Sequence, residues 1–175
     1  MEQYIFYPNL NFDLDRIKEI VKRHMTLRIP GYASHQRRVR DEPYLLELQA
    51  KYPFLSNLYN IYTTAPNYRT PIHICPERGC AINIPIIYTE DSHTIFYKIK
   101  EGAEAEYVKH RIYEVIKEED AVEVFRYTLD RLTLMNTQLP HGVIGGPLRA
   151  RTIMSWSVVL DSDYETTKKT LMSML

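Results

Sequence analysis

Between Leu58 and Leu160 the chain is a succession of short segments rich in Ile, Val, Tyr, Thr and Phe, separated by turn residues. β-Branched and aromatic residues fit a pleated, half-buried surface, whereas Pro, Gly, Asn and Asp interrupt it. We therefore expect strands near residues 58–64, 71–75, 80–88, 93–99, 105–116, 121–129, 132–137, 141–144 and 150–160. So many short strands joined by short turns indicate an antiparallel sandwich or barrel.

Helices are expected on both sides of this strand-rich region. Asp13 begins a helix in which Leu14, Ile17, Ile20 and Val21 share one face at helical spacing. A second, shorter helix is predicted from residue 42 to 50, with a proline in its first turn. The run 161–163 (Asp-Ser-Asp) is a plausible cap for a final helix at roughly 163–174.

The remaining N-terminal residues are expected to be less regular. Residues 2–7 read as a short strand that Pro8 ends. Residues 28–42 are predicted to be a loop, and the basic run from Gln36 to Arg40 favours a solvated surface over a contact for an anionic substrate.

Length and composition limit the classes of protein that this chain fits. At 175 residues it is expected to form one domain, residues 1–175, with the strand-rich core at approximately 55–160. Its 22 basic and 22 acidic residues leave no net charge, so nothing indicates a nucleic-acid partner. We find no signal peptide and no apolar run approaching the ~20 residues of a membrane span. Cys75 and Cys80 flank a turn, but nothing else indicates an oxidising compartment, so a cytoplasmic protein is expected.

Two histidines stand out by their context. His73 lies on an extended segment that turns at Pro76–Gly79 and continues into an apolar segment, and His141 lies between Pro140 and Gly142. A single histidine on a strand is more often a structural residue than a metal ligand, and that alternative holds for each of them. We nevertheless interpret the two as halves of one pocket that holds a metal.

Arg151 supplies the third element of this interpretation, because it opens an apolar strand ten residues after His141. A charge there is costly unless it is paired, and the planar guanidinium matches a carboxylate. We predict that Arg151 binds an acidic co-substrate. The alternative is that the two histidines are unrelated and that Arg151 pairs with an internal acid such as Asp130.

These motifs resemble those of a known family. The sequence contains His73, then Cys-Ala-x-Asn-x-Pro at 80–85, Asn-Thr-x-x-Pro-His-Gly-Val at 136–143, and Arg-x-x-x-Ser-Trp-Ser at 151–157. Over roughly residues 55–160 this pattern is similar to the iron(II)- and 2-oxoglutarate-dependent oxygenases, in particular the small aspartyl/asparaginyl β-hydroxylase-like members, phage-encoded ones included. The resemblance implies a mostly β double-stranded β-helix (jelly roll) with Fe(II) at its open mouth and 2-oxoglutarate as cosubstrate. It also implies oxidative chemistry that ends in hydroxylation of a prime substrate.

Roles for individual residues follow from the resemblance. His73 and His141 would be the two iron ligands, and Arg151 would bind the far carboxylate of 2-oxoglutarate. Asn83 and either Tyr97 or Thr94 would line the cosubstrate pocket. Trp156 is expected to lie in the core.

Cys75 departs from the family pattern, in which a carboxylate ligand follows two residues after the first histidine. Three interpretations stay open: Cys75 is a thiolate ligand to the metal, it is a spectator in a two-histidine site, or the site is inactive. Glu77, two residues further on, is an alternative source of the missing carboxylate. The facial arrangement of two histidines and one carboxylate leaves metal positions open for cosubstrate and oxygen.

Two other functions compete with the oxygenase. One is a non-catalytic jelly-roll protein with a structural or binding role, such as a virion or assembly component. The other is a cupin-type metal enzyme that does not use 2-oxoglutarate, which leaves Arg151 unexplained. The sequence indicates neither the prime substrate, whether a small molecule or a peptide, nor an oligomeric state.

Overall fold

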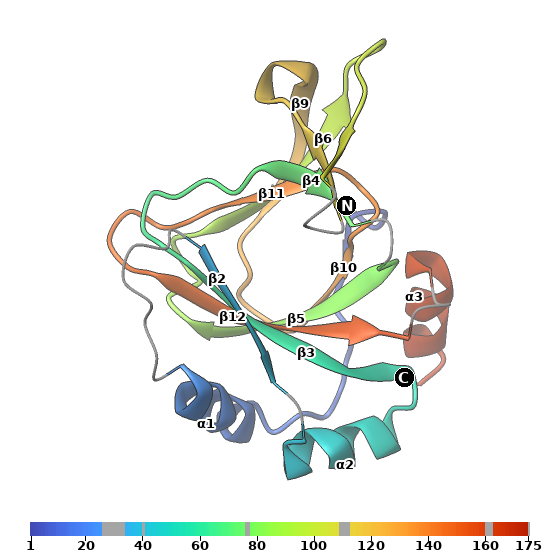
Figure 1. Cartoon of the computed structure of the whole chain (residues 1–175). Helices are drawn as coiled ribbons and strands as arrows, with labels where there is room; N and C mark the ends of the chain where they lie inside the picture. The colour runs from blue at the N-terminus through green and yellow to red at the C-terminus, as the bar shows by residue number, and fades with distance from the viewer. Residues whose placement is uncertain (26–33, 40, 76–77, 109–112, 160–162, 175) are drawn as a thin grey trace.

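The computed structural model describes the chain apart from residues 26–33, 40, 76–77, 109–112, 160–162 and 175. Its strands form two six-stranded sheets in which all neighbouring strands are antiparallel (Figure 1). The first sheet has the order β1 (Ile5–Phe6), β10 (Thr133–Asn136), β5 (Cys80–Ile87), β12 (Arg151–Val158), β3 (Leu55–Thr64) and β2 (Ser34–Val39). The second has the order β7 (Glu106–Val108), β8 (Tyr113–Ile116), β4 (Ile72–Ile74), β11 (His141–Ile144), β6 (His93–Ile99) and β9 (Ala121–Tyr127).

The order of strands defines the fold. From β4 onward the chain repeatedly crosses between the sheets, so that strands remote in sequence become neighbours, such as β4 and β11 in one sheet and β3 and β12 in the other. This arrangement is the double-stranded β-helix, or jelly roll, and it confirms the fold class expected from the sequence.

Three helices pack on the outer face of the first sheet, and each begins as its sequence predicts. In α1 (Leu14–His24) the side chain of Asp13 accepts a hydrogen bond from the Arg16 amide, and in α3 (Tyr164–Met172) Asp163 does the same for Thr166. The intervening helix α2 (Pro43–Lys51) has a proline in its first turn, where no amide hydrogen is needed. No described helix has the length and apolar character needed to cross a membrane.

The main hydrophobic core lies between these helices and the first sheet. Its members come from α1, α2, α3 and one face of the sheet, with Trp156, Ile82 and Ile84 almost completely buried at its centre. A smaller apolar cluster lies between the two sheets and contains Ile5, Phe96, Tyr127, Leu129, Met135 and Ile153. The space between the sheets also contains most of the buried polar side chains, which makes it the part of the fold available for a site.

The structure corrects two sequence predictions. The segment 28–42 is not only a loop, because residues 34–39 form β2, which pairs with β3 along the edge of the first sheet. Its polar composition concealed a strand, since an edge strand needs few apolar residues and often carries basic ones. The single strand expected at 105–116 is instead two strands, β7 and β8, that pair with each other, so a reversal of the chain falls within the predicted run.

Candidate metal and anion site

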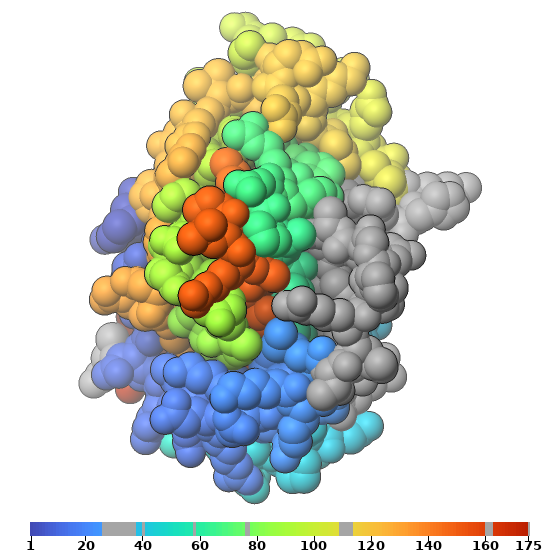
Figure 2. All heavy atoms as spheres, turned by 90° about the vertical axis from the view of Figure 1, so that its left-hand side faces the viewer, coloured from blue at the N-terminus to red at the C-terminus, as the bar shows by residue number. Residues whose placement is uncertain are grey.

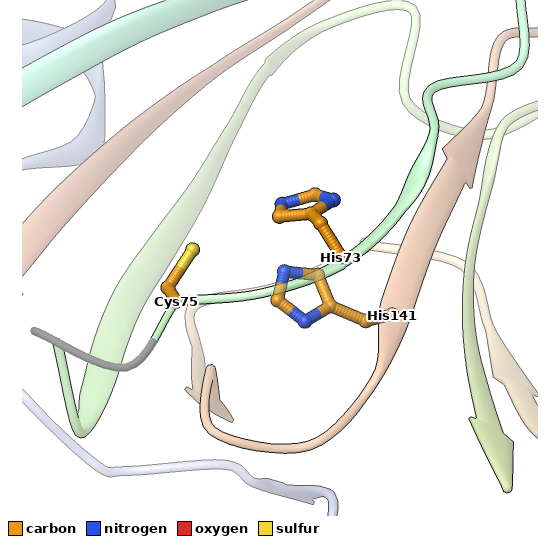
Figure 3. A group of neighbouring side chains, drawn as sticks. All are labelled: His73, Cys75 and His141. Carbon is orange, nitrogen blue, oxygen red and sulfur yellow. The ribbon is translucent and has the colours of Figure 1, made fainter. Parts of the chain in front are cut away.

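Sheet pairing brings the two histidines together. His141, the first residue of β11, is the register partner of His73 in β4. Their ring centroids lie 4.3 Å apart with a tilt of 54° between the planes. Figure 3 shows both rings and the Cys75 side chain directed toward one region. The two halves of the predicted pocket are therefore adjacent strands of one sheet.

A backbone carbonyl orients each imidazole ring. His73 Nδ1 lies 2.9 Å from the carbonyl oxygen of Pro71, and His141 Nδ1 lies 2.8 Å from that of Leu139. A carbonyl oxygen only accepts, so Nδ1 is the protonated nitrogen in both rings and the lone pair is on Nε2. Metal-binding histidines in proteins are oriented in the same way by a hydrogen bond from their second nitrogen.

Burial keeps both imidazoles neutral. It lowers the pKa of His73, and the nearby positive charge of Arg78 lowers it further. The pKa of His141 lies well below its usual value, first because the ring is buried and then because His73 is close. Neutral imidazole is the form that binds a metal, so the low pKa values of the pair favour binding of a metal ion over protonation of the rings.

Cys75 contributes a third donor atom. Its sulfur and a ring nitrogen of each histidine all lie within 4.8 Å of one another. Burial raises the pKa of the Cys75 thiol, whereas a hydrogen bond and the charge of Arg78 act in the opposite direction. Both cysteines are free thiols. Glu77, the alternative carboxylate ligand, lies outside the described residues.

Arg151 lies between the sheets as a buried cation. Only 2% of its surface is exposed, and its Nη2 donates to Thr94 Oγ1 at 3.4 Å, while Nε has no partner. Burial lowers its pKa to about 10, so the guanidinium is still charged at neutral pH. No ion pair within the described part of the chain includes Arg151, and Asp130 pairs with Arg131 at 3.0 Å instead. The predicted alternative of an Arg151–Asp130 pair is therefore wrong.

Strand β6 connects this arginine to the histidines. Phe96 is the register partner of His141, and its ring lies 6.0 Å from the His141 ring. Thr94, the contact of Arg151, is two residues away on the same strand and the same face, a step of about 7 Å. The two imidazoles and the guanidinium thus come from residues on neighbouring strands that face the space between the sheets.

Two further polar side chains border Arg151. Asn83 Nδ2 donates to Met135 Sδ at 3.4 Å, while its Oδ1 has no partner. The Tyr127 hydroxyl donates to the same sulfur at 3.5 Å and is hydrogen-bonded to Thr94 and Asn83. Burial raises the pKa of Tyr127, so it remains a neutral donor. Strand alternation places Tyr127 inward in the sequence, but no motif distinguished it, and sequence analysis missed its position beside Arg151.

The other named residues lie elsewhere. Tyr97 follows Phe96 directly on β6, so its side chain lies on the opposite face of the sheet from Thr94 and Phe96. The backbone amide of Tyr97 donates a hydrogen bond to the carbonyl oxygen of Pro140, the residue before His141, at 2.9 Å. Trp156 lies in the helix-covered core, as expected, and its indole N–H donates to Ser56 O at 2.7 Å.

Comparison with known proteins finds similar folds at low sequence identity. No family model and no curated protein matches the chain. Among solved structures, a 2OG-Fe(II) oxygenase family oxidoreductase from Burkholderia pseudomallei is 11% identical, with 83% of this chain and 77% of that chain covered and a TM-score of 0.49. A Pseudomonas putida prolyl-4-hydroxylase is 10% identical, with 88% and 90% covered and a TM-score of 0.49. HygX from Streptomyces hygroscopicus, with nickel and 2-oxoglutarate bound, is 12% identical, with 88% and 81% covered and a TM-score of 0.48.

Proposed function

We propose that this protein is an Fe(II)- and 2-oxoglutarate-dependent oxygenase that hydroxylates a prime substrate, a small molecule or a peptide side chain. The single observation that carries the proposal is that a neutral histidine pair and a buried arginine with no ion pair among the described residues both face the space between the sheets. A metal alone explains the histidines, and an anion alone explains the arginine. A metal-chelating dicarboxylate explains both.

The donor set fits such a ligand pair. His73 and His141 would hold the metal through Nε2, and Cys75 would occupy the third protein position. Arg151 would bind the far carboxylate, because its guanidinium is charged and has an unused donor in a space closed to water. The bound iron and 2-oxoglutarate would supply oxygen-dependent hydroxylation coupled to decarboxylation of the cosubstrate to succinate.

The chain's own residues bind, orient and exclude water. The carbonyls of Pro71 and Leu139 fix the imidazole rings, so that little reorganisation accompanies metal binding. Thr94, which contacts Arg151, and Tyr127, which is hydrogen-bonded to Thr94, would complete the hydrogen bonds of a carboxylate held by Arg151. Phe96 and Ile153 provide the apolar wall between the sheets. The aspartyl/asparaginyl β-hydroxylase-like type, the phage-encoded relatives and the cytoplasmic location stay predictions.

Anaerobic titration of the metal-free protein with Fe(II) and 2-oxoglutarate tests the proposal. We expect the visible charge-transfer band of the chelate in the wild type. His141→Ala should abolish the band, and Arg151→Gln should shift its appearance to much higher 2-oxoglutarate concentrations. His93→Ala is the matched control, because His93 lies on the adjacent strand β6 with its Nδ1 on Thr128 and outside the donor group. A wild type that binds neither ligand favours the non-catalytic jelly roll.

Substitution of Cys75 separates the three interpretations of that residue. Cys75→Asp should strengthen iron binding if the cysteine is a spectator, because it supplies the carboxylate that the facial arrangement uses. It should weaken binding of a thiophilic metal if the thiolate is a ligand. Failure of both wild type and Cys75→Asp to bind iron indicates an inactive site.

A further inference from the structure

Arg78 is a second arginine at the site, and the backbone holds it in place. Its amide donates to Cys75 O at 3.1 Å, and its carbonyl accepts from the Thr137 hydroxyl. The Cys75 amide in turn donates to Thr137 O at 3.0 Å. Cys75, Arg78 and Thr137 therefore form one connected unit, and the start of the Arg78 side chain is fixed relative to the Cys75 sulfur.

The side chain of Arg78 faces the donor group. It donates a hydrogen bond to Cys75, whose sulfur lies within 4.8 Å of a nitrogen of both histidines. Its charge depresses the pKa of His73 and of His141 as well. A guanidinium has five donors and a thiol sulfur takes one, so most of the fork is available to another ligand.

The charge of Arg78 is not balanced within the described residues. Five arginines of the outer surface pair with a carboxylate, namely Arg16 with Glu47, Arg23 with Glu42, Arg69 with Glu118, Arg126 with Glu123 and Arg131 with Asp130, whereas the exposed Arg149 lies over the Tyr88 ring. Arg78 lies beside Cys75, and Arg151 lies between the two sheets. Neither of these two arginines forms an ion pair with a carboxylate in the part of the chain that the structure describes. Within the described residues, which do not include Glu77, the site has two cations and no acid, and this suits it to two anionic groups.

We propose that Arg78 binds an anionic group, a carboxylate or a phosphate, of the prime substrate beside the metal. This inference rests on the proposed function and adds a substrate class to it. Arg151 is fully buried and serves the cosubstrate, whereas Arg78 is only half-buried and is therefore accessible to a molecule that enters and leaves in each turnover. The bidentate geometry of a guanidinium also fixes the orientation of the substrate relative to the metal.

The test uses the full chain loaded with Co(II) and saturated with 2-oxoglutarate, titrated with acetate and, separately, with inorganic phosphate. The d–d bands of Co(II) report an anion beside the metal without turnover. In parallel, the NMR signal of the Arg78 Nε–H is followed in the metal-free protein. Variants are Arg78→Gln, Arg78→Lys and the control Arg149→Gln, an exposed arginine that lies over the Tyr88 ring.

We expect a saturable response to at least one anion in the wild type and in Arg149→Gln. Arg78→Gln should weaken it at least tenfold, and Arg78→Lys should fall between, because lysine keeps the charge and loses the fork. The anion that responds identifies the class. The affinity for 2-oxoglutarate should change less than twofold in Arg78→Gln.

Three results overturn the inference. One is an unchanged anion response in Arg78→Gln, and another is no response to either anion in the wild type. The third is a loss of 2-oxoglutarate affinity equal to the loss of anion affinity, which assigns Arg78 to the cosubstrate. If Co(II) does not bind the wild type, the proposed function fails, and the NMR titration of the metal-free protein still decides whether Arg78 is an anion-binding residue.

Discussion

The two faces of strand β12 differ sharply. One face carries Met154, Trp156 and Val158, which pack against the helices in the main core. The opposite face carries Arg151, Ile153 and Ser155, which are equally buried but lie between the sheets. Both faces exclude water, yet one is apolar and the other is interrupted by a charge and a hydroxyl. The comparison separates the residues that stabilise the fold from those whose charge or hydrogen-bonding groups require a bound ligand as a partner.

The largest expected effect is on the helix-covered face. Trp156→Ala removes a fully buried indole that contacts Phe12 and Tyr59 and donates to Ser56 O. We expect a loss of about 3–5 kcal/mol in the free energy of unfolding, measured by urea denaturation. Trp156→Phe should cost less because it keeps most of the packing. A loss below about 1 kcal/mol for the alanine variant would mean that this face is not the main source of stability.

A substitution on the face of β12 between the sheets should leave stability unchanged or raise it. Arg151→Met removes a buried charge with no acidic partner in the described structure and keeps a similar volume. The ligand-free protein should therefore be as stable as the wild type or more stable, by about 1 kcal/mol or more. The same change should weaken 2-oxoglutarate binding about 100-fold, since it removes the partner of a buried carboxylate. Thermal unfolding with and without 2-oxoglutarate and metal measures both effects, and a destabilised ligand-free variant would contradict the comparison.

The histidine pair makes stability depend on pH. The folded-state pKa values of His73 and His141 lie below the usual 6.5, so the unfolded chain binds more protons as pH falls. The stability is thus fully present above pH 6.5 and is lost as pH falls below that value toward the folded pKa. The slope approaches about 1.4 kcal/mol per pH unit for each histidine. Urea denaturation of chelator-treated protein at several pH values tests this, and His141→Gln should flatten the slope.

The smallest expected effect concerns Tyr127. Tyr127→Phe keeps the aromatic contacts with Phe96 and Phe125 and removes only the hydroxyl near Thr94 and Asn83. We expect a change in stability of no more than about 1 kcal/mol and a several-fold loss of 2-oxoglutarate affinity. Tyr164→Phe, which removes a hydroxyl that donates to Glu2 O in the helix-covered core, is the matched control. Equal affinity in Tyr127→Phe and the wild type would place the hydroxyl outside the anion site.

Much of this organisation could be predicted from the sequence, because strand composition and turn residues are local signals. The succession of apolar segments and turns predicted an antiparallel sandwich or barrel, and the resemblance to the oxygenases implied the jelly roll. The cost of a charge in an apolar strand singled out Arg151. The edge strand β2 and the division of 105–116 into β7 and β8 could not be predicted, since pairing partners decide them. Tyr127 and Arg78 were missed for a related reason. Each acquires its role from neighbours such as Thr94 or Cys75 that only the folded chain brings to it.

The pairing of β4 with β11 has a consequence for folding. His73 and His141 come from distant parts of the chain, and a slip of one residue in their register would turn one ring to the opposite side of the sheet. The proposed metal, bound by both rings, would therefore act as a cross-link that forms only in the native alignment and closes a long loop. Such a metal would stabilise the pairing of β4 with β11, and the amide hydrogens of these two strands would exchange more slowly in metal-loaded protein than in chelator-treated protein.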